Sequence, residues 1–310
     1  MSHPDNYSTT QNNANLTAPS PHRGGHNGAP LEKDFSNGNY HQHLDNSHGS
    51  DEALRRIQTA GSISISPELF EKIYLSPQNR IHGDLRRTFG NPTPLALIGF
   101  LLSLSPLSCD LMGWRGAGGS GAANIATYFF FGGLLMILGG IGEWVIGNTF
   151  PFVVFTSFGA FWMSWGGTLQ VQFGAYSAYA TDPTNPATGI TSVGFQASFA
   201  FFFLAMGLMC FIYLICSLRT NITFFFIFLT LVVAFSCLAG AFWNTGNPAL
   251  ASKLQVVAGG FTFVTCACGW WIFAAIMLAS LDFPIQLPVG DLSRYIKGAS
   301  DKKATKEHEV

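Results

Sequence analysis

The sequence predicts an all-α polytopic membrane protein with six transmembrane helices. Of the 310 residues, 16 are basic and 17 are acidic, yet only five of these charged residues lie between residues 89 and 252. A soluble stretch of that length would carry about 40 charges, because roughly a quarter of the residues in soluble domains are charged. Apolar runs fill the same stretch and the residues after it. This composition excludes a soluble enzyme, a nucleic-acid-binding protein with a basic face and a disulfide-stabilised secreted domain.

Each apolar run is long enough to cross a bilayer, which takes about 20 residues in a helix. The runs cover residues 93–113, 124–146, 150–172, 194–217, 221–243 and 254–280. Only Gly147-Asn148-Thr149 separates the second run from the third, so we expect a tight hairpin there. Arg219 separates the fourth from the fifth, because one merged span would bury its charge at a cost of about 2.5 kcal/mol or more. We therefore assign residues 89–281 to one six-helix domain.

The segments that flank this domain differ from it in composition. Residues 1–66 are rich in Asn, Ser, His and Gly and predict a disordered tail, because they cannot bury enough apolar surface to offset the entropy of ordering. No apolar run follows Met1, so no cleavable signal peptide is expected. Residues 67–88 contain the run PELFEKIY, which indicates an amphipathic juxtamembrane helix; a transient helix within the tail is the alternative. Residues 282–310 are expected to form a C-terminal tail.

Basic residues near the helix ends predict the orientation of the chain. In membrane proteins, Lys and Arg are concentrated on the cytoplasmic side. If the N-terminus is cytoplasmic, the inner side holds Lys72, Arg80, Arg86, Arg87, Arg219, Arg294 and Lys297, and the outer side holds Arg115 and Lys253. We therefore expect a multi-pass protein with both tails in the cytoplasm, and we assign it to the plasma membrane.

The placement of histidine and cysteine argues against a metal or cofactor site within the membrane. All eight histidines lie in the two tails, so the spans offer none for a haem, a metal or a proton relay. The six cysteines lie almost entirely within apolar runs, where a thiol acts as a small hydrophobic group. Cys266 and Cys268 form a pair, but no second Cys/His pair accompanies them, so a zinc site is not expected.

Small residues in the second and third spans predict close packing of these two helices. Helices in lipid associate through small residues, because hydrophobicity does not drive them together. One face of the second span carries Gly132, Gly139 and Glu143, and one face of the third carries Gly159, Trp162, Gly166 and Gln170. Packing grooves account for the glycines but not for Glu143 or Gln170, which are therefore candidate functional residues.

Glu143 is the only acidic residue clearly inside a span, and it lies in the last turn of that span. The negative end of the helix dipole disfavours a carboxylate there, so the side chain needs a proton, a basic partner or water. One interpretation is a carboxylate on a proton or substrate pathway. The other is an interfacial carboxylate neutralised by Arg86, Arg87 or Arg219, which the predicted topology places on the same side of the membrane.

Three Asn-Pro pairs mark expected helix starts. Asn91-Pro92-Thr93-Pro94-Leu95 opens the first span, where the first backbone N–H groups have no partner within the helix and suit an anion; an ordinary helix start is the alternative. Asn185-Pro186-Ala187 and Asn247-Pro248-Ala249 are similar to the aquaporin tripeptides. Their spacing does not fit that family, and Leu250 stands where aquaporins have an arginine. Both are therefore interpreted as loop-to-helix starts.

With these segments in view, the chain resembles the acetate uptake transporter family, which comprises the succinate–acetate permeases and their fungal relatives. Residues 91–97 (NPTPLAL) are similar to the family's N-P-A-P-L-G-L signature in the first span. Residues 142–150 (GEWVIGNTF) are similar to its W-E-F-x-x-G-N-T-F hairpin, and residues 287–291 (LPVGD) to the segment after the sixth span of fungal members. The resemblance covers about residues 80–295.

The resemblance implies six-helix protomers, each with its own pore, assembled as a homo-hexamer. It implies transport of acetate and other short monocarboxylates, with protons or as anions, and no enzymatic activity. It also implies a hydrophobic constriction formed by Phe100 of the first span, Phe158 of the third and Leu229 of the fifth. The family has Tyr at the position of Phe158, and losing that hydroxyl would weaken a contact with a carboxylate by about 1–3 kcal/mol.

Three functions remain open. The first is a transporter or channel for acetate and similar monocarboxylates, with small carboxylates, protons and bilayer lipid as its partners. The second is export of ammonia or another small solute, since fungal relatives have been linked to ammonia export. The third is a non-transporting sensor that keeps the fold. The candidate path residues are Asn91, Pro92, Thr93, Pro94, Leu95, Phe100, Glu143, Phe158, Trp162, Gln170 and Leu229.

Overall fold

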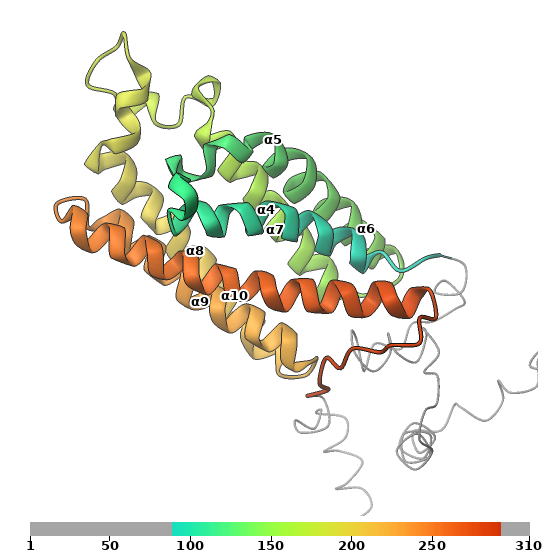
Figure 1. Cartoon of the computed structure of the whole chain (residues 1–310). Helices are drawn as coiled ribbons and strands as arrows, with labels where there is room; N and C mark the ends of the chain where they lie inside the picture. Colours follow the sequence, from blue (N-terminus) through green and yellow to red (C-terminus); the bar gives the residue numbers. More distant parts are fainter. Residues whose placement is uncertain (1–88, 293–310) are drawn as a thin grey trace, which may run out of the picture. The chain divides into compact units, whose positions relative to one another are not determined.

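The computed structural model describes residues 89–292 of the chain, and these residues form a bundle of helices (Figure 1). The helices are α4 (Thr93–Leu111), η1 (Trp114–Gly116), η2 (Gly119–Asn124), α5 (Ile125–Thr127), η3 (Tyr128–Leu135), α6 (Met136–Val145), α7 (Thr149–Leu169), η4 (Val171–Phe173), η5 (Ser177–Tyr179), η6 (Pro186–Thr191), α8 (Val193–Ser217), α9 (Ile222–Trp243) and α10 (Pro248–Ser280). Between residues 89 and 292 there is no β-strand. The predicted tail 1–66 and the predicted juxtamembrane segment 67–88 lie outside the described residues.

Five helical stretches are long and apolar enough to cross a membrane. They are Thr93–Leu111, Gly119–Val145, Val193–Ser217, Ile222–Trp243 and Pro248–Ser280, and they correspond to five of the six predicted spans. The remaining long helix, α7, has 21 residues and includes several Gly, Ser, Thr and Trp residues, and it is not among these five. The all-α membrane fold is therefore confirmed, and the sixth crossing stays a prediction.

Large apolar side chains cover the outer faces of these helices. Phe130, Trp144 and Leu208 are 65%, 64% and 63% exposed. On α8 the exposed set is Val193, Phe201, Leu204, Leu208, Phe211, Ile212 and Ile215. So large an apolar surface is unfavourable in water and is expected where lipid tails or another apolar surface cover it. The helical unit is therefore built for a membrane.

The second predicted span is one continuous rod whose middle is wound as a π-helix. α5, η3 and α6 follow each other without a break, and η3 contributes the π-helical turns. Such turns are rare in proteins and are frequently found at functional sites. In this chain they begin with Tyr128, which is fully buried, and include the buried pair Gly132 and Gly133.

α6 and α7 form the predicted close hairpin. A Cβ atom added at Gly140 would lie 2.7 Å from the Thr156 side chain of α7, and one at Gly159 would lie 2.7 Å from Ile137. Only glycine allows the helices to approach this closely. Gly147, whose φ is +86°, makes the turn between the two helices.

The glycine-bearing face of the second span was expected to pack on the third span. The part of this face that carries Gly139 and Glu143 packs on α4 instead of α7. A Cβ atom at Gly139 would lie 2.7 Å from the Cβ of Ala96, and one at Gly142 would lie 2.5 Å from Pro92. Because glycines occur on two faces of α6, their spacing alone does not say which face meets which neighbour. The consequence is that Glu143 points toward the start of α4.

α8, α9 and α10 complete the bundle. α8 and α9 run antiparallel through the short turn at Arg219, and α10 lies along both α9 and α4 (Figure 1). The hydroxyls of Thr230 in α9 and Thr265 in α10 share a hydrogen bond of 2.7 Å within the buried interface. A Cβ at Gly259 of α10 would lie 3.0 Å from Leu111, so glycine again permits the contact with α4.

Two of the Asn-Pro pairs begin helices, as predicted. The backbone N–H of Leu250 donates to Oδ1 of Asn247 at 3.2 Å, and α10 accordingly starts at Pro248, earlier than the predicted start at residue 254. Pro186 is the first residue of η6. An Asn cap followed by a proline in the first turn explains the start of α10. The side chain of Asn185 makes no capping hydrogen bond in η6, where only the proline at the first position fits the rule, because proline needs no hydrogen-bond acceptor there.

The first part of the predicted C-terminal tail is packed on the helical unit. The N–H of Ile222 donates to the carbonyl of Gly290 at 2.8 Å, and the N–H of Leu292 donates to that of Thr220 at 3.0 Å. Val289 is 3% exposed and belongs to the buried core. The compact unit therefore continues past residue 281 and ties its C-terminal segment to the α8–α9 turn.

Candidate functional site

Glu143 is fully buried and holds its carboxylate in a polar cluster at one end of the bundle. The hydroxyl of Thr93 donates to Oε1 of Glu143, and the side-chain amide of Asn148 donates to Oε2 at 2.6 Å. The backbone N–H of Asn148 also donates to the Glu143 carbonyl at 2.8 Å. Hydrogen bonds to a carboxylate are about twice as strong as those between neutral groups, so the cluster joins three helices firmly.

The local sequence explains why these three side chains meet. Oδ1 of Asn91 accepts from the N–H of Thr93 at 2.9 Å, which fixes the first turn of α4. The glycines of α6 bring that helix against Pro92, so that Glu143 reaches Thr93. Asn148 starts α7 directly after the Gly147 turn. The helix start that was predicted to suit an anion thus already faces a carboxylate of the same chain.

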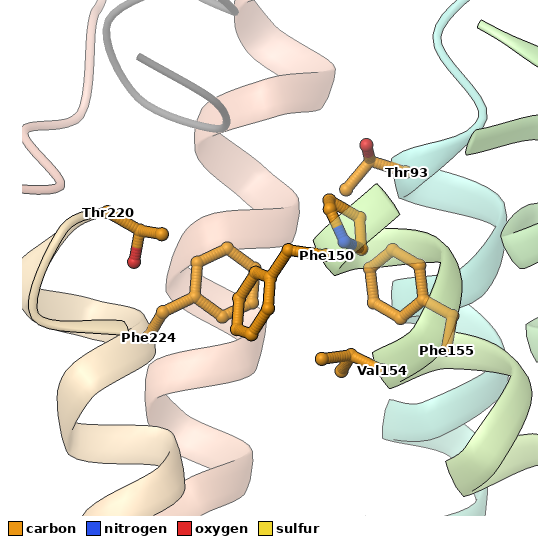
Figure 2. Close-up of a pocket in the computed structure, with 7 residues that line it drawn as sticks. Thr93, Phe150, Val154, Phe155, Thr220 and Phe224 are labelled. Carbon is orange, nitrogen blue, oxygen red and sulfur yellow. The ribbon is translucent and has the colours of Figure 1, made fainter. Parts of the chain in front are cut away.

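A small pocket, here called the Thr93 pocket, lies at this end of the bundle. It is lined by Thr93, Phe150, Pro151, Val154, Phe155, Thr220 and Phe224. Figure 2 shows the rings of Phe150, Phe155 and Phe224 crowding the space between α9 and the start of α7. Its cavity volume of about 10 Å³ is close to the minimum for one water molecule. The pocket is therefore closed to a larger solute in this conformation.

A larger pocket, here called the Trp165 pocket, lies at the other end of α7. Its lining residues are Gly119, Ser120, Trp165, Thr168, Leu169, Ile190, Thr191, Phe195, Gln196 and Phe242. Its cavity volume is about 240 Å³. Every residue that lines either pocket is uncharged. The two pockets therefore offer hydrogen-bonding groups and apolar walls without a fixed charge.

Buried aromatic and aliphatic side chains fill the middle of the bundle, and the central part of α7 runs through them. α7 contributes Phe158, Phe161 and Trp162, which are 4%, 7% and 1% exposed. α9 contributes Phe228, Leu231 and Phe235 to the same core. The ring centroids of Phe161 and Phe235 are 5.4 Å apart in an edge-on contact. This closely packed region is here called the aromatic seal, and it lies along α7 between the ends that carry the pockets.

The structure brings some predicted path residues together and separates others. Phe100, Phe158 and Trp162 lie in one buried core, and Thr93 and Glu143 are bonded to each other. Leu229 is only half-buried and outside that core, whereas Leu231 lies within it.

The remaining predicted path residues lie at the margins of the bundle. Asn91, Pro92 and Pro94 are half-buried, Leu95 is 40% exposed, and Gln170 is half-buried where α7 ends. Leu95 therefore points away from the core that holds Phe100.

Three residues of the site were not singled out from the sequence. Asn148 was counted only as part of a turn, although a buried carboxylate near a turn implies a nearby donor. Tyr128 and Trp165 are buried polar aromatics in spans that otherwise offer few polar groups. Among residues 89–292, no group of three or more His, Cys, Asp or Glu side chains could hold a metal ion.

A lipid-facing bundle of helices with an uncharged pocket at each end of α7 defines an integral membrane protein of the transporter and channel class. Residues 74–294 match the GPR1/FUN34/yaaH family, and the chain belongs to this family. This result confirms the resemblance that the motifs at residues 91–97, 142–150 and 287–291 indicated.

Individual relatives support the same assignment. Protein alcS of Aspergillus fumigatus is 44% identical over 236 residues, which are 76% of this chain and 87% of alcS. Acetate permease A of Emericella nidulans is 30% identical over 227 residues, which are 72% of this chain and 74% of the permease. The structure of the bacterial acetate channel SatP superposes with a TM-score of 0.52 at 24% identity and covers 65% of this chain and 99% of SatP. At that identity the likeness to SatP is one of fold.

Proposed function

We propose that the chain moves acetate and other short monocarboxylates across a membrane along α7. The observation that carries this proposal is the pair of uncharged pockets at opposite ends of α7, with the aromatic seal along the helix between them. A carboxylic acid with a pKa near 4.3, like that of Glu, is almost wholly anionic at neutral pH. Such an ion needs hydrogen-bond donors at the pocket mouths and a narrow apolar section that removes water. The relative named acetate permease A supports the choice of substrate.

The aromatic seal is the proposed constriction. Phe100 and Phe158 keep the roles that the resemblance implied, and we assign the position on α9 to Leu231 in place of Leu229, because only Leu231 is part of the buried core. Opening then requires these side chains to change rotamer or α7 and α9 to separate. Movement of one helix relative to another takes place in the microsecond-to-millisecond range.

We propose that Glu143 couples a proton to transport through Thr93. An ionised Glu143 accepts a hydrogen bond from the Thr93 hydroxyl. A protonated Glu143 can donate to the Thr93 oxygen instead, so that the Thr93 hydroxyl is free to donate to a carboxylate in the Thr93 pocket. Substrate binding at this end would then favour the protonated state of Glu143.

We also propose a homo-hexamer in the plasma membrane, with both termini cytoplasmic and a separate path in each protomer. The exposed apolar rows of η3, α6 and α8 supply surface for contacts with neighbouring protomers as well as with lipid. Native mass spectrometry of the purified protein in detergent tests the assembly, and a stable monomer or dimer would contradict it.

Uptake of labelled acetate into cells tests the proposed function. The full chain is expressed in a yeast strain that lacks its own acetate transporters, and uptake is measured at neutral and acidic pH beside uptake of labelled methylammonium. We expect acetate uptake above the vector control and no gain for methylammonium. A gain for methylammonium alone would favour the ammonia alternative. No gain for either solute, from protein shown to be in the membrane, would favour the sensor.

A further inference from the structure

Three buried polar atoms near the Trp165 pocket lack a hydrogen-bond partner among the described residues. They are the hydroxyl of Tyr128 and the indole Nε1 atoms of Trp162 and Trp165. The three side chains are 0%, 1% and 6% exposed. Buried polar atoms in proteins are nearly always paired with protein or ordered water, so three unpaired donors in one region need an explanation.

The three side chains are neighbours. The rings of Tyr128 and Trp162 are stacked, with centroids 5.1 Å apart and an interplanar angle of 20°. Trp165 follows Trp162 by about one turn on the same side of α7. Its indole N–H lies near enough to the Tyr128 oxygen to interact with it, but not in the geometry of a hydrogen bond. η3 therefore supplies one donor and α7 supplies two.

This group of donors borders the Trp165 pocket. Trp165 itself lines the pocket, together with Gly119 and Ser120 of η2. The next residue, Gly121, lies directly against the Tyr128 hydroxyl, and any side chain at that position would collide with it. The φ of Gly121 is +77°, which also favours glycine. The backbone of this loop therefore packs directly against the hydroxyl, on the side of Tyr128 that faces η2.

We propose that Tyr128, Trp162 and Trp165 form a binding site for the carboxylate group of a short monocarboxylate that enters through the Trp165 pocket. An indole N–H can only donate, so the ligand must be an acceptor, and a carboxylate offers acceptor oxygens without competing donors. The site rests on the proposed function, since it names where that substrate binds.

The surroundings of the donors suit a small organic anion that must leave again. Leu169, Ile190, Phe195 and Phe242 give the pocket apolar walls for a short alkyl chain. Its volume of about 240 Å³ is below the range usual for drug-sized ligands. No basic side chain lines it, and the carboxylate of Asp110 acts on Tyr128 from nearby. A bound carboxylate is therefore held by neutral donors alone and is not trapped by an ion pair. An ammonium ion, which can only donate, finds no acceptor in the two indoles.

Fluorine NMR of the full chain in lipid nanodiscs tests this site. The protein is labelled with 5-fluorotryptophan, and acetate, propionate and methylammonium are titrated separately. We expect acetate and propionate to shift the Trp162 and Trp165 resonances with saturation, whereas methylammonium leaves them in place. If neither carboxylate shifts these resonances, the proposed site is wrong. Water molecules would then be the partners of the three donors.

Two conservative variants add a second measurement. Tyr128→Phe and Trp165→Phe each remove one donor, and we expect each to raise the apparent Kd for acetate about 5- to 10-fold. Trp144→Phe, at an exposed position of α6, is the matched control and should leave the Kd unchanged. Tyr128→Phe removes a single oxygen atom, so it keeps the fold even if Trp165→Phe does not.

The outcomes separate this site from the proposed function. If the wild-type protein transports acetate and both variants keep the wild-type KM and Kd, the site is wrong and the proposed function stands. If the wild-type protein moves no acetate, but the two resonances shift with acetate and Tyr128→Phe weakens that response, the site stands and the proposed function fails.

Discussion

The hydroxyl of Thr93 donates a hydrogen bond to the carboxylate of Glu143, which lies 50 residues later in the chain. Thr93 lines the small pocket at this end of α7, and Glu143 is fully buried behind it. The contact links the first helix of the bundle to the hairpin of α6 and α7. It also places a titratable group one hydrogen bond away from the proposed path.

Removing the Thr93 hydroxyl tests this link. Thr93→Val keeps the shape of the side chain but withdraws one donor from the buried carboxylate. We expect the free energy of unfolding to fall by about 1–3 kcal/mol, because a buried charged group then lacks part of its hydrogen bonding. We expect acetate flux to fall as well. Thermal unfolding in detergent and flux in liposomes give the two readouts.

Thr156→Val is the matched control for that change. The Thr156 hydroxyl donates to the Phe152 carbonyl of its own helix at 2.7 Å, and its removal should change stability by no more than about 0.5 kcal/mol. If both variants lose the same free energy of unfolding, the Thr93–Glu143 hydrogen bond stabilises the protein no more than the hydrogen bond of Thr156 does.

Glu143→Gln tests proton coupling. The amide has the size of the carboxylate, and its oxygen can still accept from Asn148 while its NH₂ donates to the Thr93 oxygen. The Thr93 hydroxyl is then free at every pH. We therefore expect acetate flux that has lost the rise toward acidic pH expected of the wild type. A variant with the full wild-type pH profile would assign Glu143 to structure alone.

Gly139→Ala tests the contact between α6 and α4. The added Cβ would lie 2.7 Å from the Cβ of Ala96 and 2.8 Å from its backbone nitrogen, so one helix must move. We expect a loss of about 1–3 kcal/mol in unfolding free energy from overpacking. Gly260→Ala is the control: nothing lies within 4 Å of its added Cβ, and a gain of about 0.5–1 kcal/mol is expected from the better helix propensity. Similar melting temperatures for the two variants would refute the contact.

Phe158→Tyr tests the aromatic seal. A hydroxyl at this position would offer a donor to a carboxylate that passes through the proposed constriction. We expect acetate flux to rise about 5-fold or more, because one added hydrogen bond is worth about 1 kcal/mol. Phe130→Tyr adds the same hydroxyl at a position that is 65% exposed and should leave flux unchanged. An unchanged or lower flux in folded Phe158→Tyr protein would place the constriction elsewhere.

Gly290→Ala tests the docking of the C-terminal segment. Gly290 has a φ of +69°, and an added Cβ would lie 2.5 Å from the Ile222 side chain. Alanine is therefore strained by about 1–2 kcal/mol from its backbone conformation alone. We expect faster hydrogen exchange at the amides of Ile222 and Leu292, whose partners lie across this contact. Gly246→Ala, with nothing within 4 Å of its Cβ, should leave exchange at those amides unaltered.

Much of the fold could be predicted from the sequence because lipid imposes simple requirements. The near absence of charge between residues 89 and 252 and the length of the apolar runs follow directly from the membrane as solvent. Asn247-Pro248 marked a helix start correctly, because capping chemistry is local. The start of α10 was still predicted too late, since Lys253 interrupts the apolar run without interrupting the helix.

The site was harder to predict because it depends on contacts between distant segments. Spacing placed Gly139 and Glu143 on one face of α6, but it could not show that α4 covers that face. Glu143 was recognised as unusual, whereas its partner Asn148 was taken for a turn residue. Leu231 and Leu229 are equally apolar in the sequence, and only the rotation of α9 places Leu231 in the core.

Acetate flux into liposomes tests the central claim most directly. The purified full chain is reconstituted, and uptake of labelled acetate down a gradient is measured at neutral pH, where the substrate is an anion, against empty liposomes of the same lipid. The account predicts saturable acetate uptake that unlabelled propionate inhibits. Uptake equal to that of empty liposomes, from protein confirmed to be folded and inserted, would contradict it.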